Sequence, residues 1–380
     1  MDGKPAEAKD SSELRPSLIE PPTKRLMSLD ALRGFDMAFI VGGSVILRSF
    51  GKAIGPEAHE WIVQQTTHPE WHGYSAWDQI FPLFMFVSGV AMPFALTRRI
   101  ENGTSRRELA WKVVRRGLLL ILLGFIYNRI LKLDLANQRY PSVLGRIGLG
   151  YLFAGLIVLS TKIRGQLIWT LGILIGYCLA LTCVPVPGFG AGDLQPGHTI
   201  ADYVDRLLVP GKLYHGDRDP EGLFSTLPAI ATVLSGALAG HWLRRNDLSG
   251  SKKAAGLLGG GVLCVLLGLV WNSWLPFNKN LWSSSFVLLT SGISLALLAL
   301  FYYVIDVQRY RRWAFFFVVI GMNAITIYLL RKFVDIEGIG QTLFAVAEDR
   351  VHPAIFSASE LFTGWLILYV LYRRKIFLRV

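Results

Sequence analysis

The stretch SSFVLLTSGISLALLALFYYVI, residues 284–305, decides the fold class of this chain. It carries no charged side chain over about 22 residues, and an α-helix of that length rises about 33 Å. The hydrocarbon core of a bilayer is about 30 Å thick. The stretch therefore predicts a helix that crosses a membrane, because a helix at the surface of a soluble protein would carry polar residues on one face.

Apolar stretches of similar length recur along the chain. Of the 380 residues, 52% are hydrophobic and 17% are charged, and the mean hydropathy is +0.41. We predict an all-α integral membrane protein, a polytopic bundle of about ten transmembrane helices. The predicted spans are Ala31–Leu47, Ile80–Thr97, Val113–Ile130, Val143–Ser160, Leu167–Val184, Phe224–Leu243, Ala254–Trp271, Ser284–Ile305, Trp313–Leu330 and Leu361–Tyr372.

Two segments are expected to lie outside these spans. Residues 1–26 are polar and rich in proline, which predicts a disordered cytoplasmic tail ahead of a transmembrane domain over residues 27–380. The amphipathic stretch Ile339–Phe356 is interrupted by Glu348, Asp349, Arg350 and Pro353. We expect it to be an interfacial or re-entrant segment.

Lysine and arginine collect on one side of the predicted spans, and this sets the orientation. Roughly 25 of the 39 basic residues fall on the side of the N-terminal tail, and such an excess marks the cytoplasm. Both termini are therefore predicted to be cytoplasmic. The net charge of +12 arises from these flanks and not from a basic stripe on a soluble domain, so nucleic acid is not an expected partner.

Two long loops, Gly51–Trp77 and Pro185–Glu221, then face away from the cytoplasm and hold most of the seven histidines. A polar site on that face is expected. The three cysteines lie in apolar spans without CxxC spacing, which indicates core packing. GxxxG spacings at Gly172/Gly176 and Gly236/Gly240 predict close contacts between helices.

Polar residues inside apolar spans are costly in a bilayer and are therefore functional candidates. The motif SLDALRGFDM, residues 28–37, places Asp30, Arg33 and either Asp36 or Met37 on one helical face. Asp30 and Arg33 can form an ion pair that helps packing, or they can hold a charged ligand directly. The residues alone leave both interpretations open.

The segment HPEWHGYSAWDQIFPLFMFVSG, residues 68–89, carries the second set of candidates. His68 and His72 precede the second span, and Asp78 lies at its entrance. A histidine can take a proton from an attacking nucleophile or carry an acyl group, and a carboxylate can fix its tautomer. The alternatives are a structural role for a loop histidine or a metal site, for which the HxxxH spacing lacks a third ligand.

A third set of polar residues is scattered along the chain. Arg146 is the most informative, because a guanidinium cannot be neutralised and needs an anion, a ligand or water inside a membrane. The others, which could also be loop or interface residues, are Arg139, Asp219, Glu221, Asn280, Trp282, Ser283 and Asn323.

Taken together, these motifs resemble the heparan-alpha-glucosaminide N-acetyltransferase family of transmembrane acyltransferases. The matching stretches, which run in the family's order from about residue 26 to 380, are SLDALRGF, HPEWHGYSAWDQIFPLFMFVSG, RYPSVLGRIGLGY, VPVPGFGAGDLQPG, DPEGLFSTL, NLWSSSFV, GMNAITIY and YRRKIF.

The resemblance implies roles for particular residues. His68 matches the family's catalytic histidine, with Asp78 beside it, and Ser44 stands about where the family has an asparagine. We expect acetyl-CoA to contact Arg33, Arg146, Asn280, Trp282 and Ser283. We expect the acceptor to contact Asp30, Ser44, Glu221 and Asn323.

The resemblance also implies a reaction, in which an acetyl group passes from cytosolic acetyl-CoA to the amino group of a glucosamine-type sugar. The catalytic loop would face the periplasm of a bacterial inner membrane, no metal is expected, membrane lipid surrounds the bundle, and a homodimer is one candidate assembly. The alternative is an amino-sugar transporter of the inner membrane, because intramembrane Asp and Arg residues also suit a permease. A scaffold without catalysis is the third interpretation, and CoA bound to the purified protein would favour the enzyme.

Overall fold

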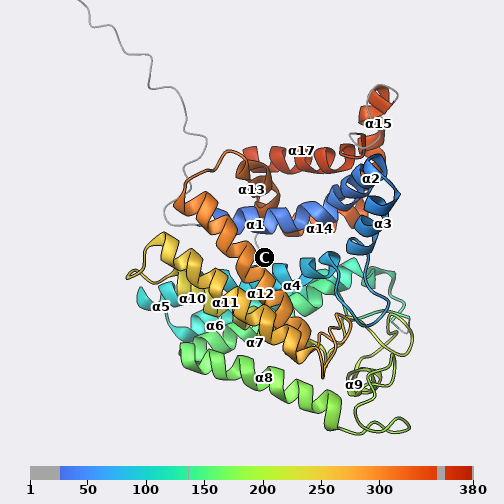
Figure 1. Cartoon of the computed structure of the whole chain (residues 1–380), viewed down its shortest axis with the longest axis vertical. Helices are drawn as coiled ribbons and strands as arrows, with labels where there is room; N and C mark the ends of the chain where they lie inside the picture. The colour runs from blue at the N-terminus through green and yellow to red at the C-terminus, as the bar shows by residue number, and fades with distance from the viewer. Residues whose placement is uncertain (1–25, 136, 349–355, 379–380) are drawn as a thin grey trace, which may run out of the picture.

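The computed structural model describes residues 26–135, 137–348 and 356–378, and the regular elements in these ranges are helices (Figure 1). The predicted tail lies outside the described residues except for Leu26. The α-helices are α1 (Met27–Ala38), α2 (Ser44–Ile54), α3 (Pro56–Gln65), α4 (Ile80–Met92), α5 (Arg98–Glu101), α6 (Arg106–Tyr127), α7 (Val143–Ser160), α8 (Ile163–Cys183), α9 (Ile200–Leu208), α10 (Thr226–Leu243), α11 (Gly250–Trp271), α12 (Ser284–Phe301), α13 (Ala314–Met322), α14 (Ala324–Phe333), α15 (Ile336–Glu348) and α17 (Ser359–Arg373). Short π-helical turns at Phe39–Gly43, Pro93–Thr97 and Tyr302–Val307 extend α1, α4 and α12.

Helices long and apolar enough to cross a membrane support an integral membrane protein. Among the described residues there are seven such stretches, or eight if the bent pair α13 and α14 forms one span. The predicted number of ten is not confirmed. Each of the other two predicted spans coincides with a helix, but α6 carries Lys112, Arg115 and Arg116 in its first half and α17 has only 15 residues. The helix α15 covers the start of the predicted interfacial segment, whose residues 349–355 lie outside the described ranges.

The predicted span Trp313–Leu330 is broken in the middle. At Asn323 the chain leaves helical geometry (φ −127°, ψ 33°), and α13 and α14 meet at 70°. An asparagine side chain can bond to nearby backbone in place of the helix ladder, which favours a break. Here Nδ2 of Asn323 donates to the carbonyl of Ile376 (3.2 Å), and its Oδ1 accepts from the backbone N–H of Leu378 (3.4 Å).

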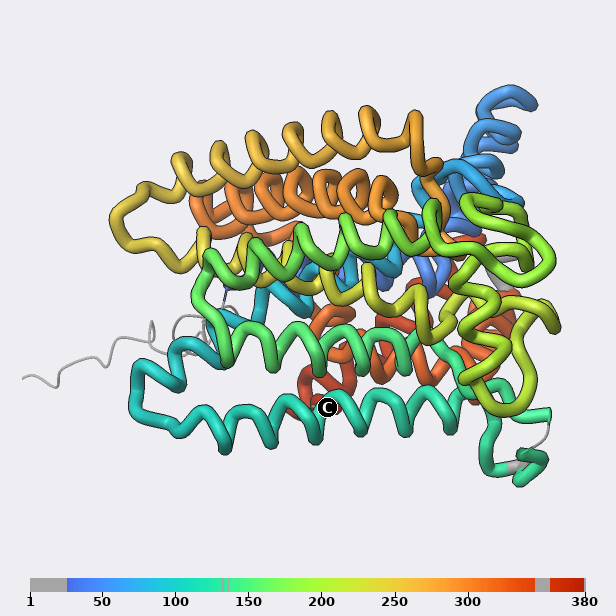
Figure 2. The backbone as a smooth tube through the Cα atoms, turned by 90° about the horizontal axis from the view of Figure 1, so that it is seen from below, coloured from blue at the N-terminus to red at the C-terminus, as the bar shows by residue number. Residues whose placement is uncertain are grey.

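The long helices run side by side between two ends of the molecule (Figure 2). At one end, Arg244 after α10 forms an ion pair with Glu101 after α4 (2.6 Å), and Arg106 at the start of α6 donates to the carbonyl of Leu159 at the end of α7 (3.1 Å). These contacts gather the basic clusters 98–116 and 244–253 at the same end. These two groups of basic residues, which contribute to the predicted orientation, therefore lie at the same end of the bundle.

Glycines allow the closest helix crossings. A Cβ atom on Gly34 of α1 would lie 1.7 Å from the carbonyl oxygen of Phe317 in α13, and one on Gly236 of α10 would lie 2.0 Å from the carbonyl oxygen of Phe86 in α4. The GxxxG prediction is therefore confirmed at Gly236 and Gly240. It is wrong at Gly172 and Gly176, where a Cβ atom would have no neighbour within 4 Å because that face of α8 points away from the bundle.

The opposite end is built from the long loops. The backbone N–H of Gly73 donates to the carbonyl of Phe277 (2.8 Å), and the indole of Trp71 donates to the carbonyl of Leu194 (2.7 Å). The loop that holds His68 is thus tied to the loop between α11 and α12 and to the long loop before α10. This junction positions the candidate site.

Candidate functional site

His68 and Asp78 come together where the chain enters α4. Asp78 lies in the 3₁₀ turn Ala76–Gln79, and its Oδ2 accepts hydrogen bonds from the backbone N–H (3.0 Å) and hydroxyl (3.3 Å) of Ser75. Its Oδ1 lies 2.6 Å from Nδ1 of His68. The carboxylate is fully buried, whereas the imidazole is 46% exposed. Asp78 therefore favours the tautomer with hydrogen on Nδ1, in which Nε2 carries the lone pair that can accept a proton.

Lys279, in the loop between α11 and α12, completes this group. Its Nζ lies 2.8 Å from Nε2 of His68 and 3.9 Å from Oδ1 of Asp78. Burial lowers the pKa of Lys279 below its ordinary value, and the negative charge of Asp78 opposes that shift. A tight turn presents the lysine: Asn278 accepts from the backbone N–H of Leu281 (2.9 Å) and donates its own N–H to the hydroxyl of Ser283 (3.1 Å).

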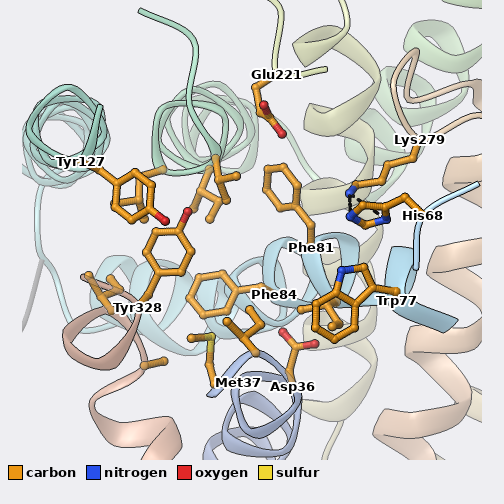
Figure 3. Close-up of a pocket in the computed structure, with 17 residues that line it drawn as sticks. Asp36, Met37, His68, Trp77, Phe81, Phe84, Tyr127, Glu221, Lys279 and Tyr328 are labelled. Carbon is orange, nitrogen blue, oxygen red and sulfur yellow. Dashed lines mark hydrogen bonds between the residues drawn. The ribbon is translucent and has the colours of Figure 1, made fainter. Parts of the chain in front are cut away.

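Two cavities meet at this group. The inner cavity, of about 420 Å³, extends into the bundle and is lined mainly by apolar and aromatic side chains, among them Met37, Phe81 and Phe84 (Figure 3). The outer cavity, of about 400 Å³, lies among the loops and is lined by polar residues such as Glu70, Arg139 and Asn280. The residues that line both cavities are His68, Tyr127, Val143, Glu221, Lys279 and Tyr328.

Arg139 anchors the loop segment that carries Glu221. Its guanidinium bonds both oxygens of Asp219, through Nε (2.8 Å) and Nη2 (2.7 Å), and also pairs with Glu221. It lies 4.6 Å over the ring of Tyr214. Burial alone would lower the pKa of Arg139, but the hydrogen bonds to Asp219 and the charge of Glu221 raise it above its ordinary value. The arginine is therefore held as a fixed cation at the edge of the outer cavity.

Arg146 and Trp282, predicted to contact acetyl-CoA, lie behind the cavity wall and line neither cavity. Arg146 is 1% exposed, donates to Ser225 and to the carbonyl of Gly222 (3.3 Å), and lies 5.0 Å over the ring of Trp282. Trp282 packs edge-on against Phe81, at 4.9 Å between ring centroids. Their visible role is to support the aromatic wall.

The other predicted residues are distributed unevenly. Glu221 lines both cavities and Asn280 lines the outer one. Ser283 is buried, and its hydroxyl donates to the carbonyl of Pro276 in the loop that carries Lys279. Asn323 donates to the carbonyl of Ile376 near the end of the described chain. Neither of these two residues lines a cavity, and the same holds for Asp30 and Arg33, which pair at 3.5 Å in α1, and for Ser44 at the start of α2.

His72, the second histidine of the motif, points elsewhere. Its Nδ1 lies 3.3 Å from Nδ2 of Asn278, it lines neither cavity, and burial lowers its pKa. Within the described part of the chain, no three His, Cys, Asp or Glu side chains gather where they could hold a metal ion.

Sequence reasoning missed Lys279, Tyr127 and Tyr328. The lysine directly precedes the NLWSSSFV motif, so its position next to a recognised segment was the available signal. The rings of the two tyrosines, one on α6 and the other on α14, stack with their centroids 4.9 Å apart. No local sequence pattern connects these two helices.

Comparison with known proteins bears on this site. Residues 25–194 match a family model described as a domain of unknown function, DUF5009. A heparan-alpha-glucosaminide N-acetyltransferase from Mus musculus is 28% identical, with 97% of this chain and 63% of the relative covered. The protein of the same name from Homo sapiens is 29% identical, with 95% of this chain and 60% of the relative covered. The chain thus spans less than two thirds of the length of these relatives, and both matches support the family resemblance of its sequence.

Proposed function

From the similarity of this chain to the heparan-alpha-glucosaminide N-acetyltransferases, we propose that it is a membrane-bound acetyltransferase. The acetyl group of cytosolic acetyl-CoA is transferred to the amino group of a glucosamine-type sugar on the periplasmic side of a bacterial inner membrane. The observation that carries the proposal is the position of His68. Its Nδ1 is held by buried Asp78, and its side chain lies where an apolar and a polar cavity meet.

The two cavities suit two different substrates. A sugar brings many hydroxyl groups, which need polar partners once they leave water. The outer cavity offers such partners in Glu70, Arg139 and Asn280. The inner cavity is apolar and suits the thin thioester arm of the donor. His68 lines both cavities and can therefore act where an amine from one side meets a thioester from the other.

The chemistry requires a base because the amine nitrogen must give up a proton as it bonds to the thioester carbon, and a hexosamine amine is mostly protonated at neutral pH to begin with. After the ammonium loses one proton to solvent, the amine nitrogen attacks the thioester carbon while Nε2 of His68 takes a second proton. The C–S bond of the tetrahedral intermediate then breaks. The departing thiolate of CoA receives the proton from the imidazolium, so the products are the amide and free CoA thiol.

Lys279 supports the same step. The carbonyl oxygen of the thioester becomes negative in the tetrahedral intermediate, and a fixed cation or hydrogen-bond donor beside it lowers the barrier. The Nζ of Lys279 lies 2.8 Å from Nε2 of His68, the proton acceptor, and is therefore close to where that oxygen would form. When the acceptor amine takes its place against Nε2, the ammonium of Lys279 can turn to the oxyanion.

The CoA end of the donor is proposed to remain at the basic end of the bundle. Its phosphates favour arginine and lysine, which concentrate in the clusters 98–116 and 244–253. Arg33, in the middle of α1, keeps its proposed role in donor binding.

The test is acetyl transfer to glucosamine by reconstituted protein with acetyl-CoA supplied on the cytoplasmic side. His68→Ala should lower turnover by about 10²–10⁴-fold, since that is the usual contribution of a general base. His72→Ala is the matched control, because His72 lies in the same loop but lines neither cavity. Near-normal turnover by the His68 variant would remove the central claim, and equal losses in both variants would reduce it to a structural effect.

Thermal stabilisation by acetyl-CoA separates this enzyme from a transporter. A ligand that binds the folded state shifts the unfolding equilibrium, so acetyl-CoA should raise the melting temperature of the detergent-purified protein and of His68→Ala alike. No shift at saturating acetyl-CoA would favour an amino-sugar transporter.

A further inference from the structure

Asp36, on α1, is a buried carboxylate that the chemistry at His68 does not use. The residue is 2% exposed, and its Oδ2 has no hydrogen-bond partner among the described residues. A buried polar oxygen without a partner is costly, and in a membrane such a carboxyl is a candidate ligand contact.

The side chain borders the inner cavity and also a neighbouring apolar cavity of about 450 Å³. Figure 3 shows Asp36 and Met37 on the side opposite Glu221, with Trp77 and Phe84 beside them. Other wall residues near this helix, Ile40 and Ile80, are apolar. The helix that carries Asp36 packs closely on α13, because Gly321 allows the backbone of α1 at Asp30 to lie against it.

This environment selects the kind of group that Asp36 can bind. A sugar ring at this end would bury several hydroxyls against apolar side chains, and each unpaired hydroxyl would cost free energy. A thin chain with a few amide N–H groups brings one donor to the carboxylate and places its methylene groups against Met37, Phe84 and Ile40. The pantetheine-type arm of an acyl thioester has this chemistry.

We propose that Asp36 accepts a hydrogen bond from an amide N–H of the acyl donor's pantetheine arm, and so sets the depth at which the thioester reaches His68. The inference rests on the proposed acetyl transfer and identifies a donor-binding residue for it. Figure 3 shows Asp36 at the edge of the inner cavity opposite Glu221 and His68 at its side next to Lys279, so the arm would extend along the cavity wall from one to the other.

The test compares two donors with the full-length reconstituted protein: S-acetylpantetheine, and an analogue in which both amide nitrogens are methylated. In the wild type, methylation should lower kcat/KM about tenfold, the usual cost of one buried hydrogen bond. In Asp36→Leu the two donors should differ little, while the KM for glucosamine stays unchanged. Asp36→Asn, which keeps an acceptor oxygen, should restore most of the discrimination. Lys212→Ala, at an exposed lysine that lines neither cavity, should behave as the wild type.

The outcomes separate this inference from the proposed function. If the wild type does not transfer acetyl groups, the proposed function itself fails. If the wild type transfers acetyl groups but treats both donors alike, or if Asp36→Leu changes the KM for glucosamine instead, only the inference about Asp36 is overturned. Equal treatment of both donors by the wild type overturns the inference even if Asp36→Leu does not fold.

Discussion

Lys279 brings a cation to within 2.8 Å of the proton-accepting nitrogen of His68, yet it lies 211 residues away in the sequence. Replacing it with methionine, which is similar in length but uncharged, should lower kcat for acetyl transfer by about 10²–10³-fold, the usual cost of losing one oxyanion donor. The KM values for both substrates should change much less. A large rise in KM with normal kcat would instead assign Lys279 to substrate binding.

The pH dependence of turnover gives a second prediction for Lys279. Burial lowers its pKa from the ordinary 10.5, and the charged form is the one that stabilises an oxyanion. Activity should therefore be present while the ammonium is charged and be lost as pH rises through its lowered pKa. Lys279→Arg keeps a charge at all accessible pH values, so any activity that it retains should persist to higher pH. If the activity of the wild type and of Lys279→Arg fell over the same alkaline pH range, this assignment would be contradicted.

The predictable part of the site is the part encoded locally. His68 and Asp78 are ten residues apart in one segment, and their pairing at 2.6 Å agrees with the expected histidine and carboxylate pair. The contact with Lys279 could not be predicted, because it depends on how the loop between α11 and α12 folds back over α4. Arg146 lies behind the cavity wall, where it donates to Ser225 and lies over the ring of Trp282, while its Nε and Nη1 have no partner among the described residues. Its contact with acetyl-CoA stays a prediction.

At the level of elements, the clamp formed by Arg139, Asp219 and Glu221 fastens the segment before α10 over the outer cavity. The backbone N–H groups of Tyr214 and Glu221 both donate to Asp219, at 3.0 and 2.9 Å. Arg139→Ala should loosen this segment, because it leaves a buried carboxylate without its cation. Hydrogen exchange at residues 212–222 should accelerate, and the KM for glucosamine should rise about tenfold or more with little change in acetyl-CoA binding.

Lys212→Ala is the control for this clamp, since Lys212 is an exposed lysine in the same segment. Faster exchange throughout the bundle in Arg139→Ala would indicate global destabilisation and contradict a local clamp.

Helical periodicity and length predicted most elements because each long helix carries its own apolar run. The predicted spans at α7 and α12 begin at the residues where the structure begins them. The break at Asn323 was missed because its cause is distant: the residues that satisfy the asparagine, Ile376 and Leu378, lie at the other end of the sequence. Close packing at Gly236 was predictable, whereas the outward face of Gly172 depends on where α8 lies in the bundle.

The whole molecule has a chemical asymmetry between its two ends. Ion pairs and hydrogen bonds collect the basic clusters at one end, and the loops with His68 and Asp219 form the other. Successive long helices run in opposite directions, so the connecting segments fall at the two ends in turn, and this separates the basic end from the end with His68. Helix packing alone does not say which end faces the cytoplasm. The orientation rests on the tendency of lysine and arginine to remain on the cytoplasmic side.

The orientation can be tested by labelling single cysteines in intact cells. The background variant needs Cys178, Cys183 and Cys264 replaced by serine or alanine, because Cys183 is exposed. Glu57→Cys, on α3 at the end that carries His68, should then react with a membrane-impermeant maleimide added outside. Asn246→Cys, exposed between α10 and α11 at the basic end, should react only after the membrane is opened. The opposite pattern would place His68 on the cytoplasmic side, where acetyl-CoA and the acceptor would meet without any transfer across the bundle.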